Sequence, residues 1–483
     1  MDTKNEELII DEELPVSAKL AYGAANSANT YLSGVVFGAI DVFYLKVLNA
    51  DPTLLGISWL LFIVWNMVND PLIGILQDKT KTDIGRRIPY LRYGAIIYIL
   101  TFIWVWFPIV DKQSLLFWNH LLMLFVFDTL FSMMGLIFYS MPAEMAVSQK
   151  ERGKIMVYST ALGSIGIIGS ILVPLIFLGE VPDPEGFRIV AIITGIAAGL
   201  IIFLASYRIQ ENQYTVMEES LGFFESIRET FKNKPFLIIE VAIFASVIMT
   251  QVIQGYFIFL FDYVVSFEFN LLNIILLIIL IAILGFSVWW LTSKIDKYGL
   301  KRLMFLGAIV SIIGFITLLV MGLGLGINQH NKMAFLLFFG PLAAVIFGFV
   351  GFMLLSQPLM ADCIDYDEIL TGKRRETTYA GVNALVTKPA VSIGRSIFLF
   401  IIALFGYQES ISKPFNQPST VGTGVIIAFT LIPTVCLIIG LISLYYFPLD
   451  GEEWQKKKQE IHETHQKKRR EYLKKLRDKG EIT

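Results

Sequence analysis

The chain has 483 residues, of which 55% are apolar and 17% are charged, and its mean hydropathy is +0.64. Soluble domains average about 25% charged residues, so this composition excludes an ordinary soluble protein. The formal net charge of −2 gives no basic character overall, so nucleic acid is not an expected partner. The acidic start, residues 1–15, lacks the basic-then-apolar layout of a cleaved signal peptide. The two cysteines, Cys363 and Cys436, predict no disulfide.

Apolar stretches recur along the whole chain, and each is close to the roughly 20 residues that a helix needs to cross the hydrocarbon of a bilayer. We count twelve of them, at residues 20–45, 54–76, 90–109, 115–141, 155–178, 188–207, 236–261, 271–292, 303–325, 334–359, 380–404 and 423–447. The sequence therefore predicts an all-α polytopic membrane protein with twelve transmembrane helices.

Basic residues are distributed very unevenly between the two sides of these spans. With both termini on one side, the segments of that side hold 32 of the 39 Lys and Arg residues, and the six loops of the other side hold five. Cytoplasmic loops of membrane proteins carry such an excess of Lys and Arg. We therefore expect an integral protein of the cell membrane with both termini in the cytoplasm.

The spans divide into two groups of six. We predict a cytoplasmic N-terminal segment (1–19), a six-helix half (20–207), a polar central loop (208–235), a second six-helix half (236–447) and a basic cytoplasmic tail (448–483). Two short motifs recur at equivalent places in the halves. The basic turn from Asp78 to Arg87 is repeated by the turn from Asp296 to Arg302, and MPAEM around Glu144 is repeated by LMADC around Asp362. Carriers with paired halves place a binding site at the interface between them.

Two segments resemble a known family. The string WNMVNDPLIGILQDKTKTDIGRRIPYLRYGA, residues 65–95, and the string ADCIDYDEILTGKRRETTYAGVNALVTKPA, residues 361–390, are similar to the glycoside-pentoside-hexuronide:cation symporters, the melibiose-permease-like family of the major facilitator superfamily. The resemblance implies the major facilitator fold with two pseudo-symmetric halves. It also implies a secondary active transporter that moves a sugar, glycoside or uronide-like solute by alternating access, coupled to Na+ or H+.

The chain departs from the family pattern at three positions. The second helix of the family usually reads Asp-x-x-Asn-Asp-Pro, and the first aspartate of that pattern is Asn66 here. The sugar-binding carboxylates of the family align with Thr30 and Met134, whereas the lysine of the eleventh helix is kept as Lys388. A lysophospholipid or other amphipathic anion carrier of the same fold, or an uncoupled facilitator, therefore stays open as an alternative.

Four charged residues lie well inside the predicted spans: Asp70, Asp128, Lys388 and Arg395. Each would cost roughly 2.5–3.5 kcal/mol at the bilayer centre, so each is a candidate for function. We predict that Asp70 binds the coupling cation, with Asn66 and Asn69 as neutral oxygen ligands, and that Lys388 competes for its charge. The alternative is a permanent structural Asp70–Lys388 ion pair.

We predict a substrate site from the remaining polar residues of the spans. Arg395 lies seven residues beyond Lys388 on the same helix face, so the two cations can bind an anionic group, together with Asp128. In the alternative, Asp128 neutralises Arg395 across the halves. The other predicted substrate residues are Asn26, Thr30 and Asn383, and hydrogen bonding between packed helices is their alternative reading.

Charged residues at the predicted cytoplasmic ends of the helices form a candidate gate. By the resemblance, they hold the outward-facing state shut on the cytoplasmic side; the alternative is that they are topology signals alone. The gate set consists of Asp78, Arg86, Arg87, Glu144, Asp296, Arg302 and Asp362. Asp41 and Glu240 lie nearer span ends, where we expect them to contact the membrane interface. The basic pattern over 452–479 predicts a helix that is solvated or lies on an anionic leaflet.

Other classes of function find no support in the sequence. The four histidines fall in or near loops, no HExxH motif or paired Cys/His spacing occurs, and no Ser/His pair shares a span, so we do not expect an enzyme. We expect no cofactor and no metal site beyond a bound Na+. The expected partners are a small-molecule substrate, the coupling cation and the lipid bilayer, and we expect a monomer.

Overall fold

The structure is a computed structural model. It describes residues 13–460, except 110–111, 147–148, 180–181, 212–227, 266, 325–333, 373–374, 410, 412–415, 452 and 455. Within these ranges the regular structure is entirely helical. The bounds of the long helices are α1 (Val16–Lys46), α2 (Pro52–Lys79), α3 (Ile88–Trp104), α4 (Gln113–Met145), α5 (Gln149–Leu178), α6 (Pro184–Ala205), α8 (Lys234–Leu260), α9 (Leu271–Ser293), α11 (Leu300–Gly324), α12 (Ala334–Thr371), α13 (Glu376–Leu404) and α14 (Ser419–Tyr446). A π-helical turn η1 (Phe261–Val265) extends α8, and the short helix α10 (Ile295–Tyr298) precedes α11.

These long helices correspond one to one with the predicted spans. Among the described residues, eleven helices are long and apolar enough to cross a membrane, and α3 is a shorter apolar helix of 17 residues. The sequence predicted a span that continues to residue 109, but α3 ends at Trp104 and the chain turns over residues 105–107. Pro108 follows this turn, and the residue before a proline is disfavoured in helical conformation.

Polar caps and prolines fix where several helices begin. Asp51 accepts a hydrogen bond from the backbone N of Thr53 (2.7 Å) at the start of α2, and Asn233 accepts one from Phe236 (3.1 Å) at the start of α8. Such caps contribute about 1 kcal/mol each because they satisfy backbone donors that the helix leaves free. Prolines stand in the first turn of α2, α3, α6 and α8, where their missing N–H costs nothing.

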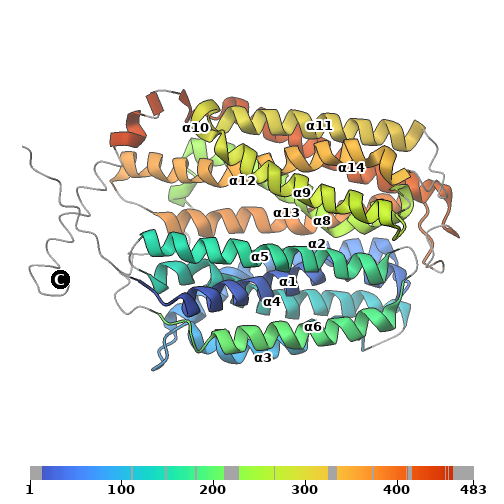
Figure 1. Cartoon of the computed structure of the whole chain (residues 1–483), viewed down its shortest axis with the longest axis horizontal. Helices are drawn as coiled ribbons and strands as arrows, with labels where there is room; N and C mark the ends of the chain where they lie inside the picture. The colour runs from blue at the N-terminus through green and yellow to red at the C-terminus, as the bar shows by residue number, and fades with distance from the viewer. Residues whose placement is uncertain are drawn as a thin grey trace, which may run out of the picture.

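The helices lie side by side in two halves, α1–α6 and α8–α14, which Figure 1 shows stacked one above the other. Packing within the halves is equivalent: α1 with α5 corresponds to α8 with α13, α2 with α4 to α9 with α12, and α3 with α6 to α11 with α14. The halves meet chiefly where α2 packs against α13 and α1 against α8. The second and eleventh spans, which carry Asp70, Lys388 and Arg395, therefore form a large part of the seam between the halves.

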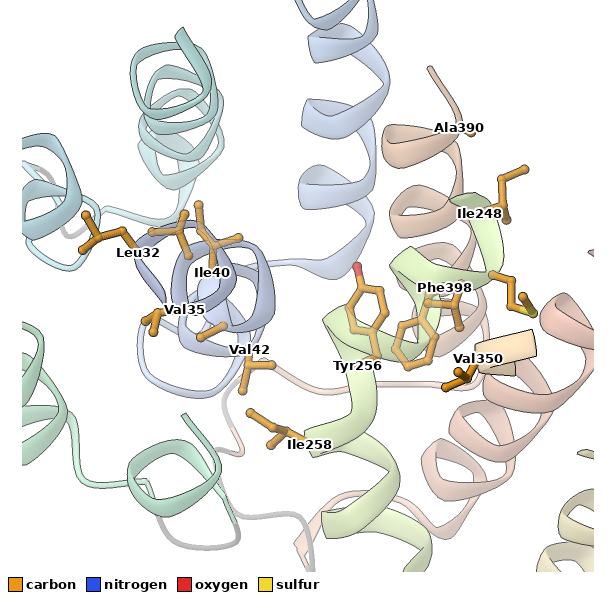
Figure 2. Packing of buried hydrophobic residues seen from close by; sticks show 14 of the residues in the cluster. Leu32, Val35, Ile40, Val42, Ile248, Tyr256, Ile258, Val350, Ala390 and Phe398 are labelled. Carbon is orange, nitrogen blue, oxygen red and sulfur yellow. The ribbon is translucent and has the colours of Figure 1, made fainter. Parts of the chain in front are cut away.

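The core at this seam is aromatic and aliphatic. The rings of Tyr256 on α8 and Phe398 on α13 stack with centroids 3.7 Å apart, and Val42 on α1 is fully buried nearby (Figure 2). Elsewhere in the bundle, glycines let helix backbones approach closely. A Cβ placed on Gly348 of α12 would lie 2.0 Å from the carbonyl oxygen of Gly307 on α11. In a bilayer the hydrophobic effect does not drive helices together. Small residues at such crossings let the backbones approach closely, and van der Waals packing then stabilises the contact.

We expect the substitution Gly348→Ala to lower the free energy of unfolding by about 1–3 kcal/mol, because its methyl group would overlap the backbone of α11. Thermal melting of the purified protein in detergent measures this loss. Gly285→Ala is the matched control, since a Cβ at Gly285 of α9 meets nothing within 4 Å. The control should leave the melting temperature unchanged or raise it, as alanine is the better helix former. Equal melting of the two variants would contradict the prediction.

Candidate functional site

A polar cluster joins α2, α4 and α13 at the seam. The ammonium of Lys388 lies 2.5 Å from Asp70 Oδ1 and donates a second hydrogen bond to Ser132 Oγ (3.1 Å). The amide Nδ2 of Asn69 donates to Asp128 Oδ2 (2.7 Å) and to the same Ser132 hydroxyl (3.1 Å). One hydroxyl thus links an ion pair between the two halves to a second carboxylate on α4.

The members of this cluster differ in exposure. The side chains of Asp70 and Lys388 are 20% and 17% exposed, whereas Asp128 and Asn69 are 4% and 1% exposed. The carbonyl Oδ1 of Asn69 is buried and has no hydrogen-bond partner among the described residues. A buried acceptor without a donor costs about 1–3 kcal/mol, so the cluster carries unused capacity to bind a donor or a cation.

Asn66 lies one helical turn before Asp70 and also faces α13. Its Nδ2 donates to the backbone carbonyl of Lys388 (3.2 Å), so its amide connects the two halves directly. The three residues predicted as cation ligands, Asn66, Asn69 and Asp70, therefore lie in one cluster together with Lys388. The sequence did not indicate Ser132, because a lone serine on an apolar helix carries no distinctive signal.

Arg395 lies in a different environment from Lys388, although both stand on α13. It is 1% exposed, and its guanidinium donates to Asp41 Oδ2 (2.9 Å), to Gln251 Oε1 (3.0 Å) and to the carbonyl oxygen of Phe37. Tyr256 OH donates to the same Asp41 oxygen (2.9 Å). These contacts lie between α1, α8 and α13 and favour a structural role for Arg395 over substrate binding in this conformation.

Two expectations about these charges are corrected by the structure. Asp41 does not contact the membrane interface: it is 1% exposed, it pairs with Arg395 in place of Asp128, and Trp59 Nε1 donates to it (2.8 Å). Glu240 is likewise 3% exposed, and neither of its carboxylate oxygens has a hydrogen-bond partner among the described residues. A position near the end of a span does not reveal burial, because neighbouring helices cover that end.

A second ion pair between the halves lies at the end of the bundle where Arg395 pairs with Asp41. The ammonium of Lys46, at the end of α1, pairs with Asp262 of η1 and donates to the carbonyl oxygens of Leu178 (2.9 Å) and Gly179 (2.6 Å). This end lies opposite the one where α1 begins and α14 ends, and we call these the distal end and the terminal end. The Lys46–Asp262 and Arg395–Asp41 pairs both cross between the halves, so the halves are bound together distally.

The remaining predicted substrate residues are partly used within their own half. Asn26 Nδ2 donates to Ser159 Oγ of α5 (2.8 Å), and Thr30 Oγ1 donates to the carbonyl oxygen of Asn26 (2.8 Å). Asn383 of α13 keeps a buried Oδ1 without a partner among the described residues. Asn26 of α1 thus serves interhelical hydrogen bonding, and Asn383, like Asn69, keeps an amide oxygen without a partner among the described residues.

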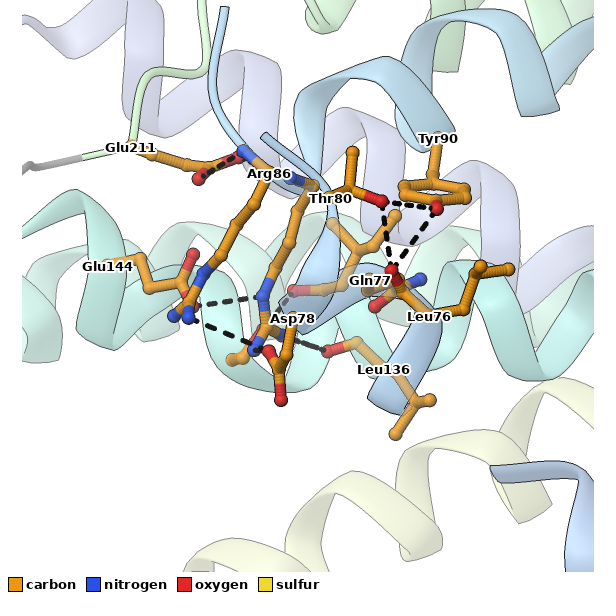
Figure 3. Close-up of polar contacts among 12 residues, drawn as sticks. Leu76, Gln77, Asp78, Thr80, Arg86, Tyr90, Leu136, Glu144 and Glu211 are labelled. Carbon is orange, nitrogen blue, oxygen red and sulfur yellow. Dashed lines mark hydrogen bonds and ion pairs between the residues drawn. The ribbon is translucent and has the colours of Figure 1, made fainter. Parts of the chain in front are cut away.

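The terminal end of the first half holds the predicted gate residues in one network (Figure 3). Glu144 Oε1 accepts from Arg86 Nη2 (2.7 Å) and lies 3.0 Å from Arg87 Nε, and both arginines also pair with Asp78, at 3.6 and 3.3 Å. Glu211 accepts from the backbone N of Arg86 (2.9 Å) and Arg87 (2.7 Å). Partial burial lowers the pKa of Arg86, but Glu144 and Asp78 raise it by more, so its pKa lies above the usual range.

The gate residues of the second half are arranged differently. Asp362 of α12 accepts from Lys458 Nζ (2.5 Å) and from Trp454 Nε1 (3.2 Å), and both donors belong to the C-terminal tail. Arg302 is exposed and has no ion-pair partner among the described residues. Asp296 lies in α10, and its side chain lies outside the described part of the structure. The predicted network is therefore formed in the first half, and a tail contact takes its place in the second.

The ion pairs define the conformation of the bundle. Among the described residues, the ion pairs between the halves are Lys46–Asp262 and Arg395–Asp41 at the distal end and Lys388–Asp70 near the middle. At the terminal end, the described ion pairs stay within one half or the central loop, or join one half to the central loop or to the tail. Ion pairs thus join the two halves at the distal end, which we call locked. The described residues form no ion pair between the halves at the terminal end, which we call unlocked.

Twelve apolar helices in two equivalent halves, with ion pairs buried between them, define an integral membrane carrier of the major facilitator fold. Residues 18–451 match the family described as MFS/sugar transport protein, and the chain belongs to this family, within the glycoside-pentoside-hexuronide:cation symporters. The family and the fold are those of secondary transporters. The predicted fold class and the predicted family are thereby confirmed.

Several characterised proteins are similar over nearly the whole chain. The sodium-dependent lysophosphatidylcholine symporter 1 of Gallus gallus is 21% identical, with 93% of this chain and 90% of the relative covered. The isoprimeverose transporter of Lactiplantibacillus pentosus is 22% identical, with 91% and 90% covered. Among solved structures, a D-xylose-proton symporter superposes with a TM-score of 0.62 at 14% identity, over 89% of this chain and 97% of that chain. At 14% identity, the similarity to the D-xylose-proton symporter shows a shared fold alone.

We expect Arg395→Gln to lower the free energy of unfolding by about 3–5 kcal/mol, because it takes the guanidinium away from the buried Asp41 carboxylate. Thermal melting in detergent is the measurement. Arg302→Gln removes the same charge from an exposed position without a described ion-pair partner and should leave the melting temperature within about one degree, as surface changes stay within roughly 0.5 kcal/mol. A stable Arg395→Gln protein would show that the distal ion pair does not hold the halves together.

Proposed function

We propose that the protein is a cation-coupled symporter that moves a small polar solute, such as a sugar, glycoside or uronide, by alternating access, with Na+ or H+ as the coupling ion. The observation that carries this proposal is the Lys388–Asp70 ion pair across the seam, with Asp128 joined to it through Asn69 and Ser132. The functions of two relatives, a sodium-dependent lysophosphatidylcholine symporter and an isoprimeverose transporter, support it.

Coupling follows from the charges of the cluster. Asp70 and Asp128 carry two negative charges when ionised and Lys388 carries one positive charge, so one monovalent cation neutralises the cluster. Carboxylate, amide and hydroxyl oxygens are the ligands that hard cations prefer. A cation that binds Asp70 displaces the Lys388 ammonium, which is then free to turn toward the solute. Because the pair joins the two halves, binding of the cation changes the contact that they share.

The proposal includes the orientation of the protein in the membrane. We place both termini in the cytoplasm because the terminal side carries the excess of Lys and Arg. The distal end then faces outward, and the conformation with the distal ion pairs Lys46–Asp262 and Arg395–Asp41 formed is the inward-facing one. In the outward-facing state these pairs break, and the terminal ends of the halves come together.

A lysophospholipid carrier is the second candidate function, and one observation favours it. The positions that align with the sugar-binding carboxylates hold Thr30, whose hydroxyl donates to its own helix, and Met134, which is fully buried. Neither provides a carboxylate for sugar hydroxyls. The lysophosphatidylcholine symporter of Gallus gallus covers as much of this chain as the sugar transporter does.

Competition in proteoliposomes separates the two candidates. Uptake of a labelled glycoside into vesicles that contain the purified protein should be inhibited by sugars and uronides and should be unaffected by lysophosphatidylcholine below its micellar concentration. Each measurement is made with and without a Na+ gradient and a proton gradient. Inhibition by the lysolipid alone, or uptake of a labelled lysolipid without sugar competition, would replace the sugar assignment with the lipid one.

We expect Asp70→Asn to abolish accumulation of solute while leaving exchange across the membrane, because the coupling cation loses its carboxylate. The accumulation ratio under a cation gradient should fall to about one, since a carrier without differential cation binding can only equilibrate its substrate. Glu240→Gln, which neutralises another buried carboxylate outside the cluster, should accumulate solute as the unmodified protein does. Full cation-driven accumulation by Asp70→Asn would leave the Asp70–Lys388 pair a structural role only.

A further inference from the structure

The C-terminal tail returns to the bundle after α14. Lys301 Nζ of α11 donates to the carbonyl oxygen of Phe447 (3.0 Å), which holds the start of the tail against the second half. Gly451 has a positive φ of 84°, a backbone conformation that favours glycine. Trp454 follows and is only 4% exposed. A tail that the sequence predicted to be solvated or membrane-bound thus starts with a docked segment.

Three contacts fix this segment on the terminal end of α12. Trp454 Nε1 donates to Asp362 Oδ2 (3.2 Å), and Lys458 Nζ donates to Asp362 Oδ1 (2.5 Å), so the tail engages both carboxylate oxygens. The ring of Trp454 meets that of Tyr366 edge to face, with centroids 6.2 Å apart. The Asp362 side chain is 4% exposed, and a charge-assisted hydrogen bond at so shielded a carboxylate is stronger than one in water.

The internal repeat shows why this contact is unusual. Glu144 and Asp362 occupy equivalent positions in the repeated motif of the two halves. In the first half, Glu144 binds Arg86 and Arg87, which belong to the loop between α2 and α3. The equivalent loop of the second half offers Arg302, which is exposed and forms no ion pair with described residues. The tail therefore supplies the cation that the loop supplies in the first half.

We propose that the start of the tail, through Trp454 and Lys458, is a latch that occupies Asp362 and stabilises the conformation that is unlocked at the terminal end. Release of Lys458 and Trp454 frees a buried carboxylate, which must then find another cation. Arg302 and the basic groups of the opposing half are among the described cations at this end, and closure of the terminal end brings the latter nearer. Release of the tail therefore favours the conformation in which the terminal ends meet.

Spin-label distances test the latch directly. Ile84 in the first half and Tyr298 in the second are both exposed at the terminal end, and each can be replaced by a labelled cysteine, since the native Cys363 and Cys436 are buried. Double electron–electron resonance on the full chain in lipid nanodiscs then reports the separation of the halves. Lys458→Glu and Trp454→Ala should each raise the ratio of short-distance to long-distance populations about five- to tenfold, which is the lower end of the usual range for coupled sites.

Lys457→Glu is the matched control, because Lys457 is the adjacent residue and its described ion pair is with Glu453 within the tail. It should give the distance distribution of the unmodified chain, and Lys458→Arg, which keeps the cation, should do the same. The rate of trypsin cleavage within the tail, which should rise in Asp362→Asn, detects release independently of the bundle conformation. Distance distributions of Lys458→Glu and Trp454→Ala that match that of Lys457→Glu would overturn the latch. The result does not depend on the identity of the solute or of the coupling ion.

Discussion

Charge inside an apolar bundle has to be paired, and in this protein the pairing is done across the seam between the two halves. α13 carries both intramembrane cations, and each finds its carboxylate on a helix of the other half: Lys388 on α2 and Arg395 on α1. Separating a buried charge from its partner costs several kcal/mol, so each pair stabilises the conformation in which it is formed. A carrier whose halves must separate at alternate ends needs contacts of this kind.

The two cations of α13 serve this purpose at different depths. Arg395 is fully buried with Asp41, Gln251 and Tyr256 around it, and its fork of donors is satisfied by protein atoms. Lys388 is partly exposed, and its neighbours include a buried amide oxygen without a donor. An ammonium is a compact, hydrated point charge on a flexible stem, whereas a guanidinium presents a rigid, pre-organised fork of donors. The arrangement thus favours a structural lock at Arg395 and an exchangeable site at Lys388.

The terminal end shows how a repeated sequence can diverge in use. Both halves keep a carboxylate at the end of a long helix, Glu144 on α4 and Asp362 on α12, and both keep a basic loop nearby. In the first half the loop arginines reach the carboxylate, and Glu211 fixes the loop by accepting from its backbone N–H groups. In the second half, Trp454 and Lys458 of the tail bind the equivalent carboxylate, Asp362. The symmetry of the fold is therefore broken by a segment outside the repeat.

The sequence by itself determined the class of fold, the twelve spans and the family, because hydrophobic length and the segments around residues 65–95 and 361–390 are local properties. It also identified Asp70, Asn69 and Lys388 as candidates, since any charge or amide inside a span stands out. Only the tertiary structure decided which charges meet. The sequence offered Asp128 as a partner for Arg395 and placed Asp41 at the membrane interface, whereas in the structure α1 packs against α8 and Arg395 pairs with Asp41. Likewise, the docking of Trp454 and Lys458 on Asp362 depends on the positive φ at Gly451 and on the surface of α12, neither of which the periodicity of the tail encodes.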